Sequence, residues 1–364
     1  MRAARSTHPS NITLTRLWPY LATIAIWAIS VIAKLKYNGL VYGLDYGIYQ
    51  PDGAHYTYRT LAFLGHSPID AANQTVDWYS THAFKRNIIS PESLLPQTNP
   101  VWGLVSSRIL YPILSIPFVA LFGIPGMLAI PALSLLALLI VTTYLFKSKP
   151  LIGLLLVTAL TASPTIMRWM MVNYTDALLT GLFALTTLLL SKFQQNTKHL
   201  LLLSTLIIAT SATRICLPIW LVIALVLYIN NAKKSALLTG AASTIAALPA
   251  LLLQPKNAIQ PDLATLPFLT KLLHLPISFF KIGAVESGQI IILDHALAAI
   301  LATALYLAIK NYKAIHSQFF LTILIAVWII GTINGVLGVN FRYQLSLIPF
   351  ALWVIRERFA DVER

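Results

Sequence analysis

The stretch GMLAIPALSLLALLIVTTYLF, residues 126–146, holds no charged side chain. A transmembrane helix needs about 20 mostly apolar residues to cross a hydrocarbon core of about 30 Å. Similar runs continue to the C-terminal region, which excludes a secretory signal followed by a soluble domain. A membrane barrel would instead show alternating segments of about ten residues, so these runs predict helices. They cover 14–33, 126–146, 151–167, 176–191, 199–213, 217–230, 236–253, 288–309, 318–338 and 342–355.

Composition supports the same fold class. Hydrophobic residues make up 57% of the 364-residue chain and charged residues only 10%, whereas soluble domains carry about 25% charged residues. We therefore expect an all-α, polytopic transmembrane protein with about ten spans. It would form a single integral-membrane domain over 1–364, without a separate soluble domain.

The net charge of +14 is better explained by membrane topology than by nucleic acid. There is no basic run of five or more residues, so no nucleic-acid partner is expected. The lone Cys216 excludes an internal disulfide and any multi-cysteine metal site.

Basic residues orient the runs, because cytoplasmic loops are enriched in Lys and Arg. Both termini are predicted to be cytoplasmic, with outer loops at 36–125 and 254–287, in a bacterial inner (plasma) membrane. The proline-broken stretch 109–122 would lie in the interface or re-enter, because a full crossing there would turn the later basic clusters outward. Lys34 and Lys36 are exceptions that snorkelling would explain.

The first outer loop is too long for a simple connector. Asp52 is placed like the N-cap of a helix over 53–64 that Gly65 ends. Ser67-Pro68-Ile69-Asp70 resembles a second helix start, and Asn99-Pro100 a third. In the second outer loop, the apolar stretch 263–281 predicts an interfacial helix.

Carboxylates and arginines gather at the predicted outer ends of the runs. Charges near hydrocarbon are costly, which favours a functional site there, with interhelical ion pairing as the alternative. Asp294 is expected about one turn inside its helix. The carboxylate of Asp52 suits a general base that deprotonates an acceptor hydroxyl, although simple helix capping explains its position equally well. Arg108, Arg214 and Arg342 would stabilise a departing phosphate.

These segments resemble the GT-C superfamily of integral-membrane glycosyltransferases, including the protein O-mannosyltransferase and aminoarabinose transferase branches. The resemblance covers most of the chain through short motifs. Its elements are Asp52-Gly53-Ala54-His55-Tyr56, Arg108-Ile109-Leu110-Tyr111-Pro112, Asn173-Tyr174-Thr175-Asp176, Thr213-Arg214 and Phe341-Arg342-Tyr343-Gln344.

The resemblance implies a polyprenyl-phosphate-linked sugar as donor and a glycan, lipid or protein as acceptor. Asp52 would be the catalytic base of an inverting transfer, and Arg108, Arg342 and Arg214 would bind the donor phosphate. Residues lining the cavity would be Asp45, His55, Tyr56, Tyr111 and Asp176.

The resemblance to the GT-C superfamily also bears on cofactor use. No cofactor is required, but some relatives use a divalent metal, for which Asp45, Asp52, His55 and Asp176 offer ligands. The chain departs from the family in two ways. Gly53 stands where a second adjacent acid is frequent, so Asp45 is the candidate for that role. The C-terminal soluble domain of many members is also not expected here.

A membrane transporter or flippase for a lipid-linked sugar or polar solute is the alternative function. Transporters often combine internal repeats with broken helices and charges near the midplane. The predicted placement of charges at outer helix ends favours the enzyme. An inactive scaffold with the same fold is a third interpretation.

Overall fold

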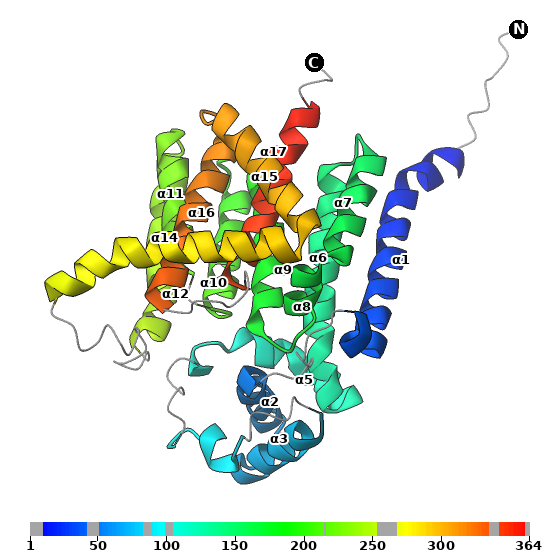
Figure 1. Cartoon of the computed structure of the whole chain (residues 1–364), viewed down its shortest axis with the longest axis vertical. Helices are drawn as coiled ribbons and strands as arrows, with labels where there is room; N and C mark the ends of the chain where they lie inside the picture. The colour runs from blue at the N-terminus through cyan, green and yellow to red at the C-terminus, as the bar shows by residue number, and fades with distance from the viewer. Residues whose placement is uncertain are drawn as a thin grey trace, which may run out of the picture.

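The computed structural model describes residues 10–41, 51–82, 89–98, 105–214, 216–252, 268–334 and 342–360 (Figure 1). This part of the chain is helical and contains no strand, which confirms the all-α prediction. Its elements are α1 (Ser10–Val41), α2 (Pro51–Phe63), α3 (Pro68–His82), η1 (Pro91–Leu94), α5 (Leu110–Phe122), η2 (Ile124–Leu128), α6 (Ala129–Leu145), α7 (Pro150–Ala162), α8 (Pro164–Met170), α9 (Thr175–Ser191), α10 (Thr197–Ser211), α11 (Leu217–Ile229), α12 (Lys233–Leu252), α14 (Phe268–Leu293), α15 (His295–Lys310), α16 (Ile315–Asn334), η3 (Arg342–Leu347) and α17 (Ile348–Ala360).

Within the described residues, two helical segments are long and apolar enough to cross a membrane. They are Leu17–Lys36 and Ile124–Leu145, and the second contains most of the stretch 126–146. A third span is added if α7 and α8, bent by 71° at their junction, count as one. Other apolar helices have 10–17 residues, about 15–25 Å at 1.5 Å per residue. The structure is thus consistent with a membrane protein, while about ten spans stay a prediction.

Two of the predicted continuous runs are broken in the structure. The run 151–167 bends at Ser163, and the run 288–309 is divided between α14 and α15 at Asp294. The sequence predicted Asp294 inside a helix. In the structure it lies at the boundary between α14 and α15. Figure 1 shows α14 lying across the neighbouring helices. Residues 268–281 of the predicted interfacial helix are helical and belong to α14, and 253–267 lie outside the described residues. The place of this helix at a membrane interface stays a prediction.

The carboxylate of Asp294 explains both breaks. It is 2% exposed and accepts hydrogen bonds from the backbone N–H of Leu297 in α15 and of Thr165 in α8, each at 3.1 Å. The hydroxyl of Ser163 also donates to it. One buried side chain thus satisfies N–H groups in the first turns of two helices, which would otherwise lack partners.

The helices α1, α6, α7, α9–α12 and α15–α17 form what we call the bundle, around a large apolar core. Small and hydroxyl residues set the close approaches. A Cβ added at Gly181 of α9 would lie 3.1 Å from the Cβ of Ser134 in α6. The hydroxyls of Thr23 and Thr143 are 2.7 Å apart and join α1 to α6. Such contacts are common where helices pack in membranes.

A second unit, which we call the lobe, contains α2, α3, η1, α5 and η2 and has its own smaller core. Gly65 has φ +96° after α2, as the predicted stop requires. The hydroxyl of Ser67 accepts from the N–H of Asp70 at 3.2 Å and confirms the second helix start. Residues 99–104, including the predicted third start, lie outside the described residues.

Two smaller predictions need correction. The helix begins at Pro51, so Asp52 lies within the first turn of α2 and not before it, a difference of the size that helix ends usually show. Lys34 is only 3% exposed. It is buried because α1 packs against α6 and α7, so snorkelling does not describe it.

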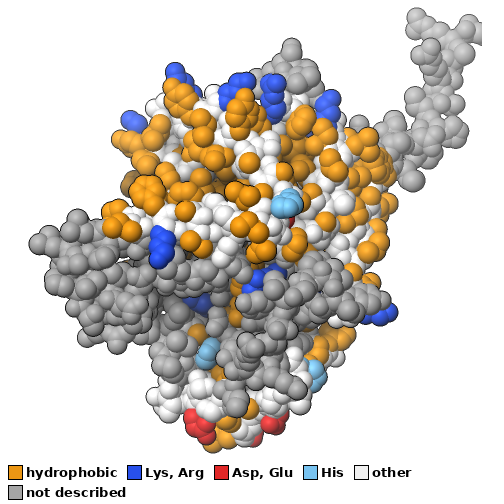
Figure 2. Space-filling view, in the orientation of Figure 1, with side chains coloured by type: hydrophobic (Ala, Val, Ile, Leu, Met, Phe, Trp, Pro, Cys, Tyr) orange, Lys and Arg blue, Asp and Glu red, His pale blue; other side chains and the backbone are white. Residues whose placement is uncertain are grey.

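The surface is divided by side-chain type. Figure 2 shows apolar side chains over the bundle, Lys and Arg both at the end near the C-terminus and around the middle of the molecule, and Asp and Glu at the opposite tip, on the lobe. Large apolar side chains stand exposed, among them Leu151 (74%), Leu237 (77%) and Leu252 (80%). A surface this apolar suits a lipid environment better than water.

Candidate functional site

The lobe meets the bundle where the start of α2 packs on the turn before α9, and we call this contact the seam. A Cβ at Gly53 would overlap the side-chain amide of Asn173, so glycine is needed for the approach. The amide of Asn173 donates to the hydroxyl of Tyr79, and that hydroxyl is 3.2 Å from the hydroxyl of Thr57. The seam therefore brings the backbone of Asp52 beside the motif 173–176.

Asp176 and Arg214 form a buried ion pair on the bundle side of the seam. Asp176 lies in the first turn of α9, and Arg214 follows α10. Their side chains are 2% and 7% exposed, and the guanidinium Nη1 donates to Oδ1. The two predicted residues are thus together. For this pair the structure shows the ion pairing that was the alternative to a substrate-binding role.

Arg108 and two tyrosines form a second buried group, on the lobe side. The guanidinium of Arg108 donates from Nη1 to the hydroxyl of Tyr56 at 2.8 Å. The rings of Tyr56 and Tyr111 meet edge to face with centroids 5.5 Å apart, and the Tyr111 hydroxyl donates to the carbonyl of Met127 at 2.9 Å. Three predicted site residues are therefore in one hydrogen-bonded and stacked chain, which fixes the direction of the guanidinium.

Arg59 is a buried cation that the sequence analysis missed. It is 7% exposed and donates to the carbonyl of Val105 at 2.7 Å and to that of Arg108 at 3.4 Å. Burial lowers the pKa of Arg59, but a guanidinium stays protonated in proteins. In the sequence Arg59 is an arginine within a short stretch of small and aromatic residues, and the burial that distinguishes it is a property of the tertiary structure. It holds the backbone of Arg108 in place.

The remaining predicted site residues are less fully placed. Asp45 and the side chains of Asp52 and Arg342 lie outside the described residues. Arg342 begins η3, which packs against α9 and α16, and His55 is half-buried on α2. No group of three His, Cys, Asp or Glu side chains that could hold a metal occurs among the residues described. Asp45 and the side chain of Asp52, two of the four predicted ligands, lie outside that part of the chain, so the possible metal site stays a prediction.

A mostly apolar cavity of about 230 Å³ opens beside η3. It lies between α14, α15, α16 and η3, with Ile290, Leu301, Trp328 and Gln344 among its lining residues. Gln344 comes two residues after Arg342. A cavity with apolar walls and few polar groups suits an apolar ligand or chain.

No known protein family, curated protein or solved structure matches this chain. The resemblance to membrane glycosyltransferases accordingly stays a prediction.

Proposed function

We propose that the protein is an inverting membrane glycosyltransferase that moves a sugar from a polyprenyl-phosphate donor to an acceptor at the outer face. The observation that carries the proposal is the seam. There the first turn of α2, which contains Asp52, packs beside Asn173. The buried Arg108 donates to Tyr56 of the same helix, and the buried Arg214 donates to Asp176, three residues after Asn173. Buried charges are costly in a membrane protein, so their presence favours a functional site.

The proposed reaction is one in-line displacement. The Asp52 carboxylate accepts the proton of an acceptor hydroxyl, and the oxygen attacks the anomeric carbon. The bond from that carbon to the phosphate oxygen breaks, and the lipid phosphate leaves as an anion. Arg108 and Arg342 would bind that phosphate, with Arg214 beside it on Asp176. Asp45, His55, Tyr56 and Tyr111 would line the acceptor side.

Two further observations fit a lipid-linked donor. The apolar cavity beside η3 would receive the first units of the polyprenyl chain next to Arg342. The basic end of the bundle lies opposite the lobe (Figure 2), as expected if that end is cytoplasmic. In this proposal the single integral-membrane domain crosses a bacterial plasma membrane about ten times, with both termini cytoplasmic.

Sugar transfer by the purified protein tests the reaction, with radiolabelled polyprenyl-phosphate sugars as donors. Asp52→Asn should lower the rate by about 10²–10⁴, the usual contribution of a general base. Asp77→Asn, at an exposed carboxylate of α3, is the matched control and should leave transfer unchanged. Equal transfer by wild type and Asp52→Asn would remove Asp52 as the base. Adding a chelator to the same assay tests the divalent metal.

Cysteine labelling tests the orientation. A cysteine at Lys147, after α6, should resist a membrane-impermeant reagent added from outside intact cells, while one at Asp77 should react. The natural Cys216 is buried, so background labelling of this residue by the reagent should be low. Efficient labelling at position 147 would overturn the proposed topology.

The 71° break between α7 and α8 favours a second candidate, a flippase or transporter of the same lipid-linked sugar. Discontinuous helices are typical of transport sites, and the buried carboxylate of Asp294 accepts hydrogen bonds at this joint. Movement of the labelled donor across a liposome membrane without a covalent product would support this candidate over the enzyme.

A further inference from the structure

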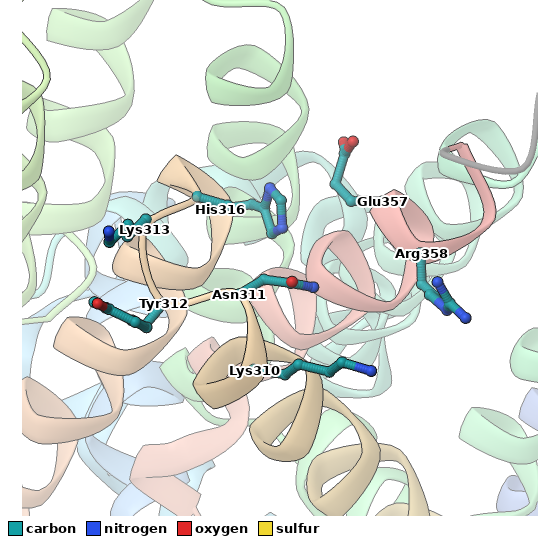
Figure 3. Close-up of a pocket in the computed structure, with 8 residues that line it drawn as sticks. Lys310, Asn311, Tyr312, Lys313, His316, Glu357 and Arg358 are labelled. Atoms are coloured by element: carbon teal, nitrogen blue, oxygen red, sulfur yellow. The ribbon is translucent and has the colours of Figure 1, made fainter. Parts of the chain in front are cut away.

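A cavity of about 420 Å³ lies at the basic end of the bundle, where α15 turns into α16 beside the end of α17. Figure 3 shows Lys310, Asn311 and His316 between Tyr312 and Lys313 on one side and Glu357 and Arg358 on the other. The lobe is at the opposite end of the molecule (Figure 1). The cavity is thus separate from the seam.

The lining of this cavity is positively charged. Lys310 and Arg358 come from α15 and α17, which pack together, and Lys313 also lines the cavity. Glu357 is the carboxylate among the lining residues, but it already accepts from Arg356 and, at 3.0 Å, from the indole N–H of Trp353. Its negative charge is therefore largely compensated within α17, and the cavity favours an anion.

Helix dipoles explain part of this arrangement. Lys310 and Arg358 lie in the last turns of their helices, where basic residues offset the negative end of the dipole. That reason does not account for the cavity between them. Nor does it account for the start of the 20-residue helix α16 at Ile315. The first-turn N–H groups of α16 favour negative charge at the same place.

Apolar side chains continue from the cavity along α15. Tyr306 and Ile309, just before Lys310, are 64% and 59% exposed, and Tyr312 is 60% exposed. An acyl chain could lie on this surface while its phosphate occupied the cavity. A free phosphate would gain nothing from these exposed groups.

We propose that this cavity binds the phosphate headgroup of an anionic phospholipid from the adjacent membrane leaflet. The ligand chemistry is a phosphate ester held by Lys310, Arg358 and the start of α16, with acyl chains along Tyr306 and Ile309. This site does not depend on the proposed sugar transfer, and each proposal can fail without the other.

The test uses the full chain purified in a neutral detergent, and binding is measured by microscale thermophoresis. The probes are dioctanoyl phosphatidylglycerol, dioctanoyl phosphatidylcholine and inorganic phosphate. Phosphatidylglycerol should bind most tightly. Lys310→Gln with Arg358→Gln should weaken it about thirtyfold, since each basic residue near a charged lipid contributes about fivefold. Glu357→Gln should tighten it, because the positive charge of Arg356 is then no longer offset by this carboxylate.

Lys233→Gln with Lys234→Gln is the matched control, because it also removes two charges from exposed residues. These lysines are at the same end, since Asn230, just before them, donates to Gln318 in the first turns of α16 at 2.7 Å. Phosphatidylglycerol affinity should stay within about twofold for this variant. Equal loss in both pairs would overturn the proposal by showing diffuse charge attraction. Equal affinity for inorganic phosphate and phosphatidylglycerol would overturn the lipid assignment, and tighter binding to phosphatidylcholine would overturn the anion site.

Discussion

The lobe and the bundle bury different kinds of side chain. The bundle core is almost entirely Leu, Ile, Val, Phe, Ala and Met with a few tryptophans. The lobe core, although much smaller, contains Tyr56, Tyr58, Tyr79 and Tyr111, and two buried arginines lie against it. A core of the first kind is held mainly by packing, with polar contacts such as those of Asp294 at helix ends. A core of the second kind needs each hydroxyl and guanidinium to find a partner in a fixed direction.

This difference bears on where the proposed sugar transfer would occur. Polar groups held in fixed directions can orient a substrate, whereas an apolar core mainly sets the distance between elements. The seam is where the two kinds of core meet, through Gly53, Asn173 and the Asp176–Arg214 pair. We therefore expect substitutions at the seam to change both stability and sugar transfer, and substitutions deep in the bundle to change stability alone.

Arg214→Met should have the largest effect. It leaves the buried Asp176 carboxylate without its partner, which costs about 3–5 kcal/mol of unfolding free energy. Chemical denaturation of the purified protein measures this. The double variant Arg214→Met with Asp176→Leu should recover most of the stability but not sugar transfer. Recovery of transfer in the double variant would show that the pair is purely structural.

Asp294→Ala should come next and should test the bundle by itself. Hydrogen bonds to the first turns of α8 and α15 are both lost, at about 1–2 kcal/mol for each helix. Asp70→Ala is the control in the lobe, because Asp70 is exposed at the start of α3, and it should cost about 1 kcal/mol or less. Similar losses in the two variants would contradict the view that Asp294 holds two helices.

Gly53→Ala should destabilise the protein by about 1–3 kcal/mol, because the added methyl group overlaps the Asn173 side chain. Gly288→Ala in α14 is the matched control, since a Cβ there meets nothing within 4 Å. It should be neutral or stabilise by up to about 1 kcal/mol. Thermal unfolding distinguishes the two, and equal effects would argue against the close approach at the seam.

Tyr56→Phe should have the smallest effect on stability, about 1 kcal/mol, because one hydrogen bond from Arg108 is lost while the ring contacts stay. Sugar transfer should fall more clearly, since the guanidinium is no longer held in one direction. Tyr306→Phe, at an exposed tyrosine of α15, should change neither quantity. If Tyr56→Phe transfers sugar at the wild-type rate, the Arg108–Tyr56 bond does not position the donor phosphate.

Local patterns predicted the helices well. The apolar runs, the glycine stop at Gly65 and the cap at Ser67 were readable because each depends on neighbouring residues. The break at Asp294 could not be predicted from the sequence. Its partners Ser163 and Thr165 are more than a hundred positions earlier in the chain, and the run 288–309 is apolar on both sides of it.

The candidate site shows the same division. Arg108, Asp176 and Arg214 were selected from the sequence as charged residues near predicted helix ends, and Tyr56 was selected through the resemblance to membrane glycosyltransferases. Their grouping into two buried clusters could not be predicted, because hydrogen bonds such as that from Arg108 to Tyr56 join residues far apart in the chain. Arg59 was missed for a related reason, since only its burial distinguishes it from a surface arginine.

The sequence by itself determined that the chain is helical, strongly apolar and basic, because composition and periodicity are properties of neighbouring residues. It also placed Arg108, Asp176 and Arg214 near helix ends, although it placed Asp294 inside a helix. Only the tertiary structure decided which of them meet, where the runs break, and that Gly53 lies against Asn173. These features depend on contacts between segments that are distant in the chain. The energies of such contacts are set by the burial of the side chains and by the direction of their hydrogen bonds, and no local sequence pattern encodes burial or direction.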